Sequence, residues 1–168
     1  MSFKIGDKVV YPNHGIGVIE QIADRPGEGK ERSFYCLRIL ANQSTVMVPI
    51  TNTDQVGLRK VVTMKEIDRV FRILRASDSA SPSDWKGRYQ ENSDRMRTGS
   101  IEEVAQVLKN LARLSQSKSL SYRERKMLDK ARYLVISEIA EVSKLPEAKV
   151  EEKVDRAIGL TLREAAEN

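Results

Sequence analysis

The spacing of apolar residues changes once along the chain, near residue 62. Before this point, short runs of β-branched and aromatic residues alternate with clusters of Gly, Pro, Asn and Asp, a pattern typical of strands joined by turns. From residue 63 onward, apolar positions recur every three or four residues, as in amphipathic helices. The sequence therefore predicts a β domain at residues 1–62 and a helical domain at 63–168.

The β half contains four runs with strand character and a shorter fifth candidate. Turn clusters such as Pro12-Asn13-His14-Gly15 separate them. Short strands at this spacing predict a small, strongly bent antiparallel sheet or barrel. The runs are 8–11, 17–22, 33–40, 45–49 and 57–61.

Five helices are predicted in the second half. Three of them begin with a capping box, in which a Ser or Thr and a Glu three residues later satisfy each other's backbone donors. These boxes begin at Thr63, Ser100 and Ser121, and the other two starts are Ser81-Pro82-Ser83-Asp84 and Pro146-Glu147. The predicted fold class is α+β, a small antiparallel β barrel followed by a five-helix bundle.

Composition removes several classes of function. The 168 residues are 40% hydrophobic and 32% charged, with a mean hydropathy of -0.47, and no apolar run approaches the roughly 20 residues of a membrane span. The first residues lack the apolar core of a secretory signal, so we expect a cytoplasmic protein. The single cysteine, Cys36, offers neither a disulfide framework nor a paired metal ligand, so no metal or cofactor is expected.

Catalytic chemistry also lacks its usual carriers. The single histidine, His14, lies in a predicted turn, and no phosphate-binding glycine loop of the GxxxxGK[ST] type is present. Adjacent carboxylates such as Glu102 and Glu103 do not face each other on a helix. We therefore expect no catalytic residues and no enzymatic activity.

Charge is distributed unevenly around a net value of +5. Residues 86–132 hold twelve basic and six acidic side chains, whereas residues 133–168 hold five basic and eight acidic ones. A local excess of this kind favours a surface that faces an anion such as nucleic acid. Solvated helix faces rich in Lys and Arg are the alternative, and charge alone leaves both open.

The single tryptophan, Trp85, stands at a predicted helix start and is followed by Lys86 and Arg88. Helical spacing places Tyr89 and Met96 on its side of the helix, where a buried stripe is the favoured interpretation for those two residues. For Trp85, a buried position and a functional one stay open. A flat apolar side chain between cations can enter the minor groove at a disrupted base step. This insertion costs a few kcal/mol in an intact duplex and less where the base pairs are already opening.

A second basic cluster begins the fourth predicted helix. Lys126 and Lys130 lie three and seven residues after Arg123, on a side of the helix away from the apolar stripe. These three cations therefore face solvent and can follow a phosphate backbone. Ion pairs with Glu124 and Asp129 are the alternative for this face.

In the β half, Arg25 in a long turn and Met47 with Arg38 in later strands suggest a surface for docking a protein, for example at a sheet edge. Nothing local proves this surface, since an arginine in a Gly/Pro turn is usually just exposed, and a methionine more often fills a core or edge position than forms a binding hot spot.

Five segments together carry a resemblance to a known family. They are 3–18, Val48-Pro49, 56–61, Asp84-Trp85-Lys86-Gly87-Arg88-Tyr89 and 126–132. In this order they resemble the CarD/CdnL family of bacterial transcription regulators that bind RNA polymerase. The first motif is shared with the polymerase-binding module of transcription-repair coupling factors, and the tryptophan-bearing helical half separates the two groups.

The resemblance implies a Tudor-like β domain that binds the polymerase β subunit and a helical domain that contacts promoter DNA at the upstream edge of the transcription bubble. It implies that Trp85 is a wedge in the minor groove there. By position, the DNA-facing cations are Lys86, Arg88, Arg125 and Lys130, and the polymerase-facing residues are Arg25 and Met47. Some relatives carry basic residues where Met47, Gly87 and Gln90 stand in this chain.

The predicted function is a regulator that stabilises the open promoter complex through largely sequence-independent DNA contacts. A protein-interaction adaptor of the polymerase without direct DNA contact is the alternative, and an RNA-binding β module ranks third because exposed base-stacking aromatics are not evident. We expect a monomer, since no heptad repeat is present. We expect it in the cytoplasm, where binding to the polymerase associates it with the nucleoid.

Overall fold

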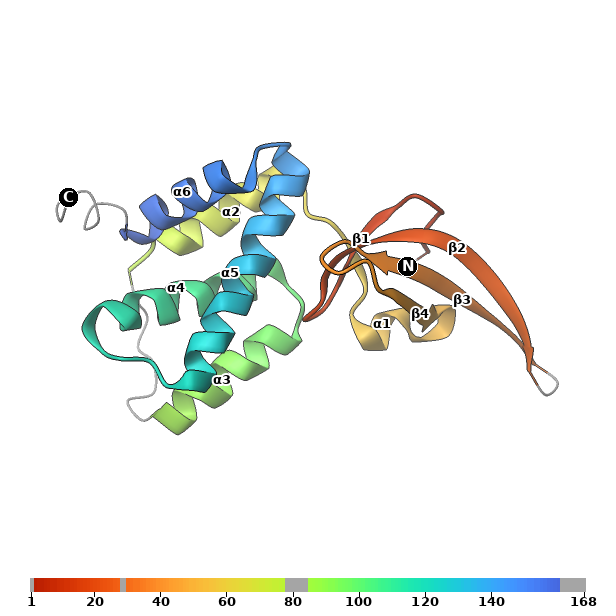
Figure 1. Cartoon of the computed structure of the whole chain (residues 1–168), viewed down its shortest axis with the longest axis horizontal. Coiled ribbons are helices and arrows are strands. Elements are labelled where there is room, and N and C mark those ends of the chain that lie inside the picture. The colour runs from red at the N-terminus through yellow and green to blue at the C-terminus, as the bar shows by residue number, and fades with distance from the viewer. Residues whose placement is uncertain (1, 28–29, 78–84, 161–168) are drawn as a thin grey trace. The chain divides into compact units, whose positions relative to one another are not determined.

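The computed structural model describes residues 2–27, 30–77 and 85–160, and for 25–27, 30–32 and 85 it describes the backbone alone. The chain divides into two units, Met1–Val61 and Val62–Asn168 (Figure 1). The first unit contains a β-sheet and the second contains helices α2 to α6. The α+β class predicted from the sequence is confirmed.

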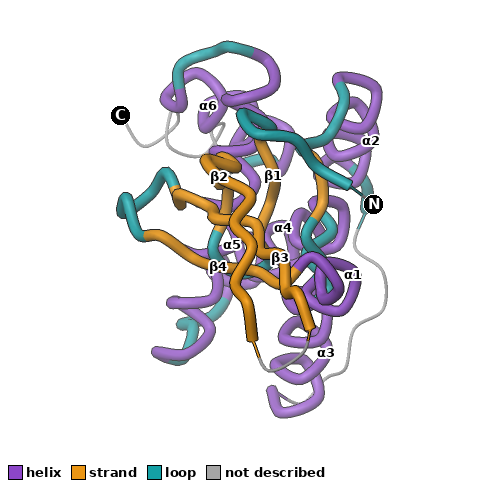
Figure 2. Tube along the Cα trace, turned by 90° about the vertical axis from the view of Figure 1, so that its right-hand side faces the viewer, coloured by secondary structure: helices purple, strands orange, loops and turns teal. Residues whose placement is uncertain are grey.

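The first unit contains an antiparallel sheet (Figure 2). Its strand order is β4-β3-β2-β1-β5. A tight turn joins the first two strands, with Asn13 at φ 67° and Gly15 at φ 93°, in the left-handed region that Asn and Gly tolerate best. His14 lies within this turn, as predicted, and its backbone N–H donates to the Tyr11 carbonyl. The strands are β1 (Lys8–Tyr11), β2 (Gly15–Gly27), β3 (Lys30–Ile39), β4 (Thr45–Pro49) and β5 (Arg59–Lys60).

The pairings among the described residues leave β4 and β5 as edges, so the sheet is open and the predicted Tudor-like barrel is not confirmed. Between these strands the chain forms a 3-10 turn, η1 (Ile50–Asn52), and a one-turn helix, α1 (Thr53–Val56). Helical backbone bonds to itself and offers no ladder for β4. β5 is two residues long and pairs with β1, which leaves it too short to close the sheet against β4.

The core of the first unit lies on one face of this sheet. Phe3 packs edge-on against Tyr35, with ring centroids 5.5 Å apart, and the Phe3 N–H donates to the Tyr35 hydroxyl at 3.0 Å. The buried Tyr35 hydroxyl is therefore satisfied by a hydrogen bond. The other buried members are Val9, Ile19, Leu37, Val48 and Leu58.

The described residues form six α-helices, one more than the five predicted, because a single turn after the sheet is the helix α1. That turn ends at Gly57 in a left-handed conformation, and it is too short to produce a helical period in the sequence. The other five lie in the second unit: α2 (Met64–Arg75), α3 (Trp85–Arg97), α4 (Ile101–Ser117), α5 (Tyr122–Ser143) and α6 (Glu147–Ile158).

Two of the three predicted capping boxes are confirmed, those of Thr63 at α2 and Ser121 at α5. The box predicted at Ser100 is wrong, since the Ser100 side chain makes no capping hydrogen bond. Its intended partner, Glu103, instead accepts a hydrogen bond from Arg95 at 2.9 Å, because α3 places a guanidinium beside it. The predicted helix start at 81–84 lies outside the described residues.

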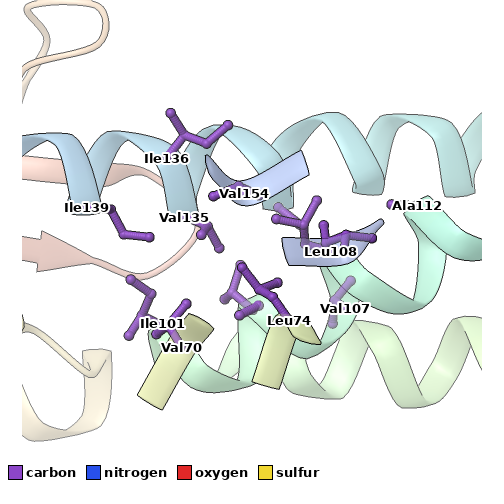
Figure 3. Packing of buried hydrophobic residues seen from close by; sticks show 14 of the residues in the cluster. Val70, Leu74, Ile101, Val107, Leu108, Ala112, Val135, Ile136, Ile139 and Val154 are labelled. Carbon is purple, nitrogen blue, oxygen red and sulfur yellow. The ribbon is translucent and has the colours of Figure 1, made fainter. Parts of the chain in front are cut away.

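Helices α2, α4, α5 and α6 surround the core of the second unit (Figure 3). Leu74 of α2, Leu108 of α4 and Val135 of α5 are fully buried there. Arg113 of α4 donates to the carbonyls of Leu74 and Ala76 at the end of α2 and to that of Ile158 at the end of α6. One cation thus satisfies carbonyl groups at two helix ends, where positive charge is favoured.

Candidate functional site

The candidate DNA surface begins at the first residue of α3, which is Trp85. The Trp85 side chain lies outside the described part of the structure, so its buried and its functional interpretation both stay untested. Lys86, the next residue, is exposed. Met96 is buried, as its helical spacing predicts, and Tyr89 is half-buried. Helix α3 packs chiefly on α4.

Arg88 does not stand free in solvent but pairs with Glu124, the third residue of α5. The Arg88 Nε donates to one Glu124 carboxylate oxygen at 2.9 Å and the Nη2 donates to the other at 3.3 Å. The exposed fractions of these side chains are 17% and 4%. A bidentate guanidinium–carboxylate contact between side chains with so little exposure to solvent is a strong one. It joins α3 to the beginning of α5.

The environment of Glu124 acts on its pKa in two directions. Burial raises the pKa, while hydrogen bonding and charge from Arg88, together with the hydrogen bonds at Ser121, lower it. The net result is a pKa below the ordinary value of 4.5. Glu124 is therefore ionised at neutral pH, and it completes both the capping box of α5 and the contact with α3.

A row of aromatic and basic side chains covers the first turns of α5. Tyr122 is 70% exposed, and the Lys126 Nζ lies 4.7 Å from the centroid of its ring. The Arg123 guanidinium lies 5.8 Å from the ring centroid of Tyr89, which is a second contact between α3 and α5. Sequence analysis did not single out Tyr122, although its i, i+4 spacing to Lys126 is a signal for such a pair.

Arg125 and Lys130 are exposed on the same helix. Within the described residues, neither they nor Arg123 and Lys126 form an ion pair. The alternative hypothesis of ion pairs with Glu124 and Asp129 therefore does not describe this face, because Arg88 occupies Glu124. Helical spacing places Lys130 on the side of α5 that carries Arg123 and Lys126. Arg125 instead lines a shallow hollow with residues 115–120, and Arg88 is engaged by Glu124.

The candidate protein-docking residues lie on different strands of the sheet. Met47 is half-buried on the edge strand β4, opposite Cys36 of β3, which is in turn opposite Gln21 of β2. Arg25 lies four residues further along β2, about 13 Å at the usual rise per residue, and its side chain is outside the described part. Arg38 pairs with Glu20 at 2.5 Å, so its charge is partly neutralised.

The described residues contain no group of three or more His, Cys, Asp or Glu side chains placed to hold a metal ion. No described helix is both long and apolar enough to cross a membrane. His14 lies against the Tyr11 ring, with centroids 4.8 Å apart, and contributes to the turn.

Comparison with protein families matches both halves of the chain. Residues 69–155 match the CarD C-terminal domain, and residues 3–62 match the CarD-like/TRCF RID domain, an RNA polymerase-interacting domain. The chain belongs to the CarD family. The resemblance drawn from the sequence motifs is thereby confirmed, and the chain is a CarD-like, RNA polymerase-associated transcription factor. Members of this family are generally non-enzymatic.

A bacterial relative agrees with this membership. The chain is 33% identical over 148 residues to YdeB of Bacillus subtilis (strain 168), described as a candidate transcription factor, and the match covers 88% of this chain and 97% of YdeB. Among solved structures, CdnLNt from Myxococcus xanthus is 45% identical, with a TM-score of 0.32, over 37% of this chain and 87% of CdnLNt.

Proposed function

We propose that this CarD-family member binds the β subunit of RNA polymerase through its sheet unit and promoter DNA through its helical unit, and that it stabilises the open promoter complex. The observation that carries the DNA part is the exposed set of cations on α5, for which the described residues supply no ion-pair partner: Arg123, Arg125, Lys126 and Lys130. A cationic surface that carboxylates do not neutralise is available to phosphates, and it binds them without regard to sequence.

Trp85 supplies the second part of the proposed contact. Trp85 is the first residue of α3, and the Arg88–Glu124 pair holds α3 against the start of α5. This pair therefore fixes the position of Trp85 relative to the cations of α5. In this proposal Trp85 enters the minor groove at the upstream edge of the bubble, where stacking is already disturbed. Lys86, Arg125 and Lys130 contact phosphates, and Arg88 contributes less because Glu124 takes two of its donors.

The sheet unit is proposed as the anchor, with Arg25 and Met47 on its polymerase-facing surface. Its support is the match of residues 3–62 to a polymerase-interacting domain. Once anchored, the helical unit meets DNA at high effective concentration, so weak phosphate contacts suffice and a monomer is enough. Such a protein acts in the bacterial cytoplasm, on the nucleoid, where the polymerase is.

Stabilisation of the open complex requires a difference in affinity. The protein shifts the equilibrium toward the open state only as far as its contacts with opened DNA exceed those with closed DNA. A wedge meets this condition, because inserting it costs less at a base step that has already lost its stacking.

The test is the lifetime of open promoter complexes after a competitor challenge, with polymerase from the same bacterium. We expect wild-type protein to lengthen this lifetime several-fold and Trp85→Ala to lose most of the effect, while Tyr133→Ala, an aromatic truncation elsewhere on α5, keeps it. An unchanged lifetime despite polymerase binding would support the adaptor alternative, in which Trp85 contacts protein or core residues.

A further inference from the structure

A groove in the helical unit lies away from the proposed DNA surface. It is formed by α2, α6 and the end of α5, and its volume is about 630 Å³. Figure 1 shows α2 and α6 near the end of α5 that is opposite α3. Its floor is apolar: Phe71 of α2 and Leu145 of the turn after α5 are partly exposed there, above the buried Ile67 and Val150. This volume is within the range of about 300–1,000 Å³ typical of ligand sites.

The rim of the groove is strongly basic. Arg72 and Arg75 of α2 stand on one side and Lys153 and Arg156 of α6 on the other, and all four are exposed. The structure, as far as it is described, gives none of them an ion-pair partner, and Asp68 is the single acidic residue among those lining the groove. Helix dipoles favour cations in the last turns of α2 and α6, but Lys153 precedes the last turn of its helix.

Four like charges around one groove repel each other, and an anionic ligand removes this repulsion. The apolar floor selects among anionic ligands. A nucleic-acid backbone offers phosphates but no apolar group to cover Phe71 and Leu145, whereas an acidic peptide offers carboxylates at the rim and an apolar side chain for the floor. Met64, 55% exposed at the groove, extends the apolar surface and adapts to varied side chains.

We propose that this groove binds an acidic peptide segment of a partner protein, with carboxylates between the α2 and α6 cations and a Leu- or Phe-like side chain on the floor. The helical unit then has two separate surfaces, one basic and aromatic on α3 and α5, and one basic and apolar between α2 and α6. This proposal stands independently of the proposed DNA contact.

The test uses the full chain and a short fluorescein-labelled peptide of Glu and Asp with leucines at i and i+4, followed by anisotropy. We expect the double variant Arg72→Glu/Lys153→Glu to weaken peptide binding about tenfold or more. The matched control Arg69→Glu/Lys149→Glu makes the same change of charge on exposed positions of α2 and α6 outside the groove, and we expect less than about a twofold effect.

Three results would overturn the proposal. One is equal binding of a peptide whose leucines are replaced by serine, since the floor would then play no part. Another is equal weakening by the control variant, which reports general charge attraction. The third is displacement of the peptide by duplex DNA from the wild type and from Arg125→Gln/Lys130→Gln alike, which assigns the groove to nucleic acid.

A second measurement uses unmodified protein and so does not depend on how a variant folds. Amide chemical shifts of the wild type are recorded by NMR during titration with the same peptide. Changes concentrated in α2, α6 and the turn at Leu145 support the proposal, and changes confined to α3 and the start of α5 contradict it. A dimer of the free protein that the charge-reversal variant dissociates would assign the groove to a second copy, also against the proposal.

Discussion

At the scale of single residues, Arg88 and Glu124 have the roles that sequence patterns describe least well. Arg88 is close to the tryptophan in sequence and resembles a DNA-facing cation, yet its guanidinium is bound to a buried carboxylate 36 residues away. Glu124 resembles a partner for the neighbouring cations of its own helix. Its burial against α3 instead leaves those cations, Arg123 and Lys126 among them, available on the surface.

The lowered pKa of Glu124 predicts a dependence of stability on pH. A carboxylate whose folded-state pKa is depressed stabilises the fold above its unfolded pKa, near 4.5, and loses this contribution as pH falls through the folded pKa. We expect Glu124→Gln to lower the free energy of unfolding by about 2 kcal/mol near neutral pH, because Arg88 loses a charged partner. The difference from wild type should shrink below about pH 4.5.

Urea unfolding at a series of pH values measures both free energies. Glu152→Gln, a carboxylate exposed on α6, is the control and should follow the wild type at every pH. A gap between Glu124→Gln and wild type that stayed constant into acid would show that the Arg88 contact does not control the ionisation of Glu124.

At the scale of elements, two starts with the same sequence signature behave differently. Ser121 accepts the backbone N–H of Glu124 at 3.2 Å and caps α5, whereas Ser100, also followed by Glu three residues later, makes no such bond at α4. The Ser100 N–H donates to the Thr98 hydroxyl, and Glu103 is held by Arg95. A capping box therefore forms where tertiary contacts do not draw its glutamate away from the cap. Arg88 binds Glu124 without breaking the box, whereas Arg95 holds Glu103.

This contrast predicts unequal effects of one substitution. Ser121→Ala should lower the free energy of unfolding by about 1 kcal/mol, since it removes an N-cap hydrogen bond. Ser100→Ala should change it by less than about 0.5 kcal/mol. Chemical denaturation of both variants beside wild type decides the matter, and equal losses would mean that the Ser100 hydroxyl caps α4 in solution.

At the scale of the whole molecule, the chain joins a sheet unit matched to a polymerase-interacting domain with a helical unit that carries most of the basic excess. In the proposed function, the sheet unit is the anchor and the helical unit makes a weak, sequence-independent DNA contact. The helical start is itself anchored, because the Val62 N–H donates to the buried carboxylate of Glu138 on α5 at 2.9 Å.

The proposed phosphate contacts predict a salt dependence for the full chain on fork-junction DNA. Each lost phosphate contact reduces the slope of log K against log salt by about 0.9 in duplex DNA, so Arg125→Gln/Lys130→Gln should reduce it by nearly two. Arg69→Gln/Lys149→Gln, with the same loss of charge on α2 and α6, should leave the slope unchanged. Anisotropy across a salt series measures it, and a wild type without any slope would favour the adaptor.

The sequence by itself determined the change from strands to helices near residue 62, the capping boxes of Thr63 and Ser121, and the solvent-facing positions of Lys126 and Lys130. All of these depend on neighbours within one or two turns of the chain, where residue spacing alone decides which groups meet.

The tertiary structure decided the rest. It set the open edge at β4, the burial of Glu124, the pairing of Arg88, the loss of the Ser100 box and the basic groove between α2 and α6. These features join groups from separate elements, and a carboxylate goes to whichever cation the packing of helices brings within hydrogen-bond distance. Local periodicity carries no information about that choice.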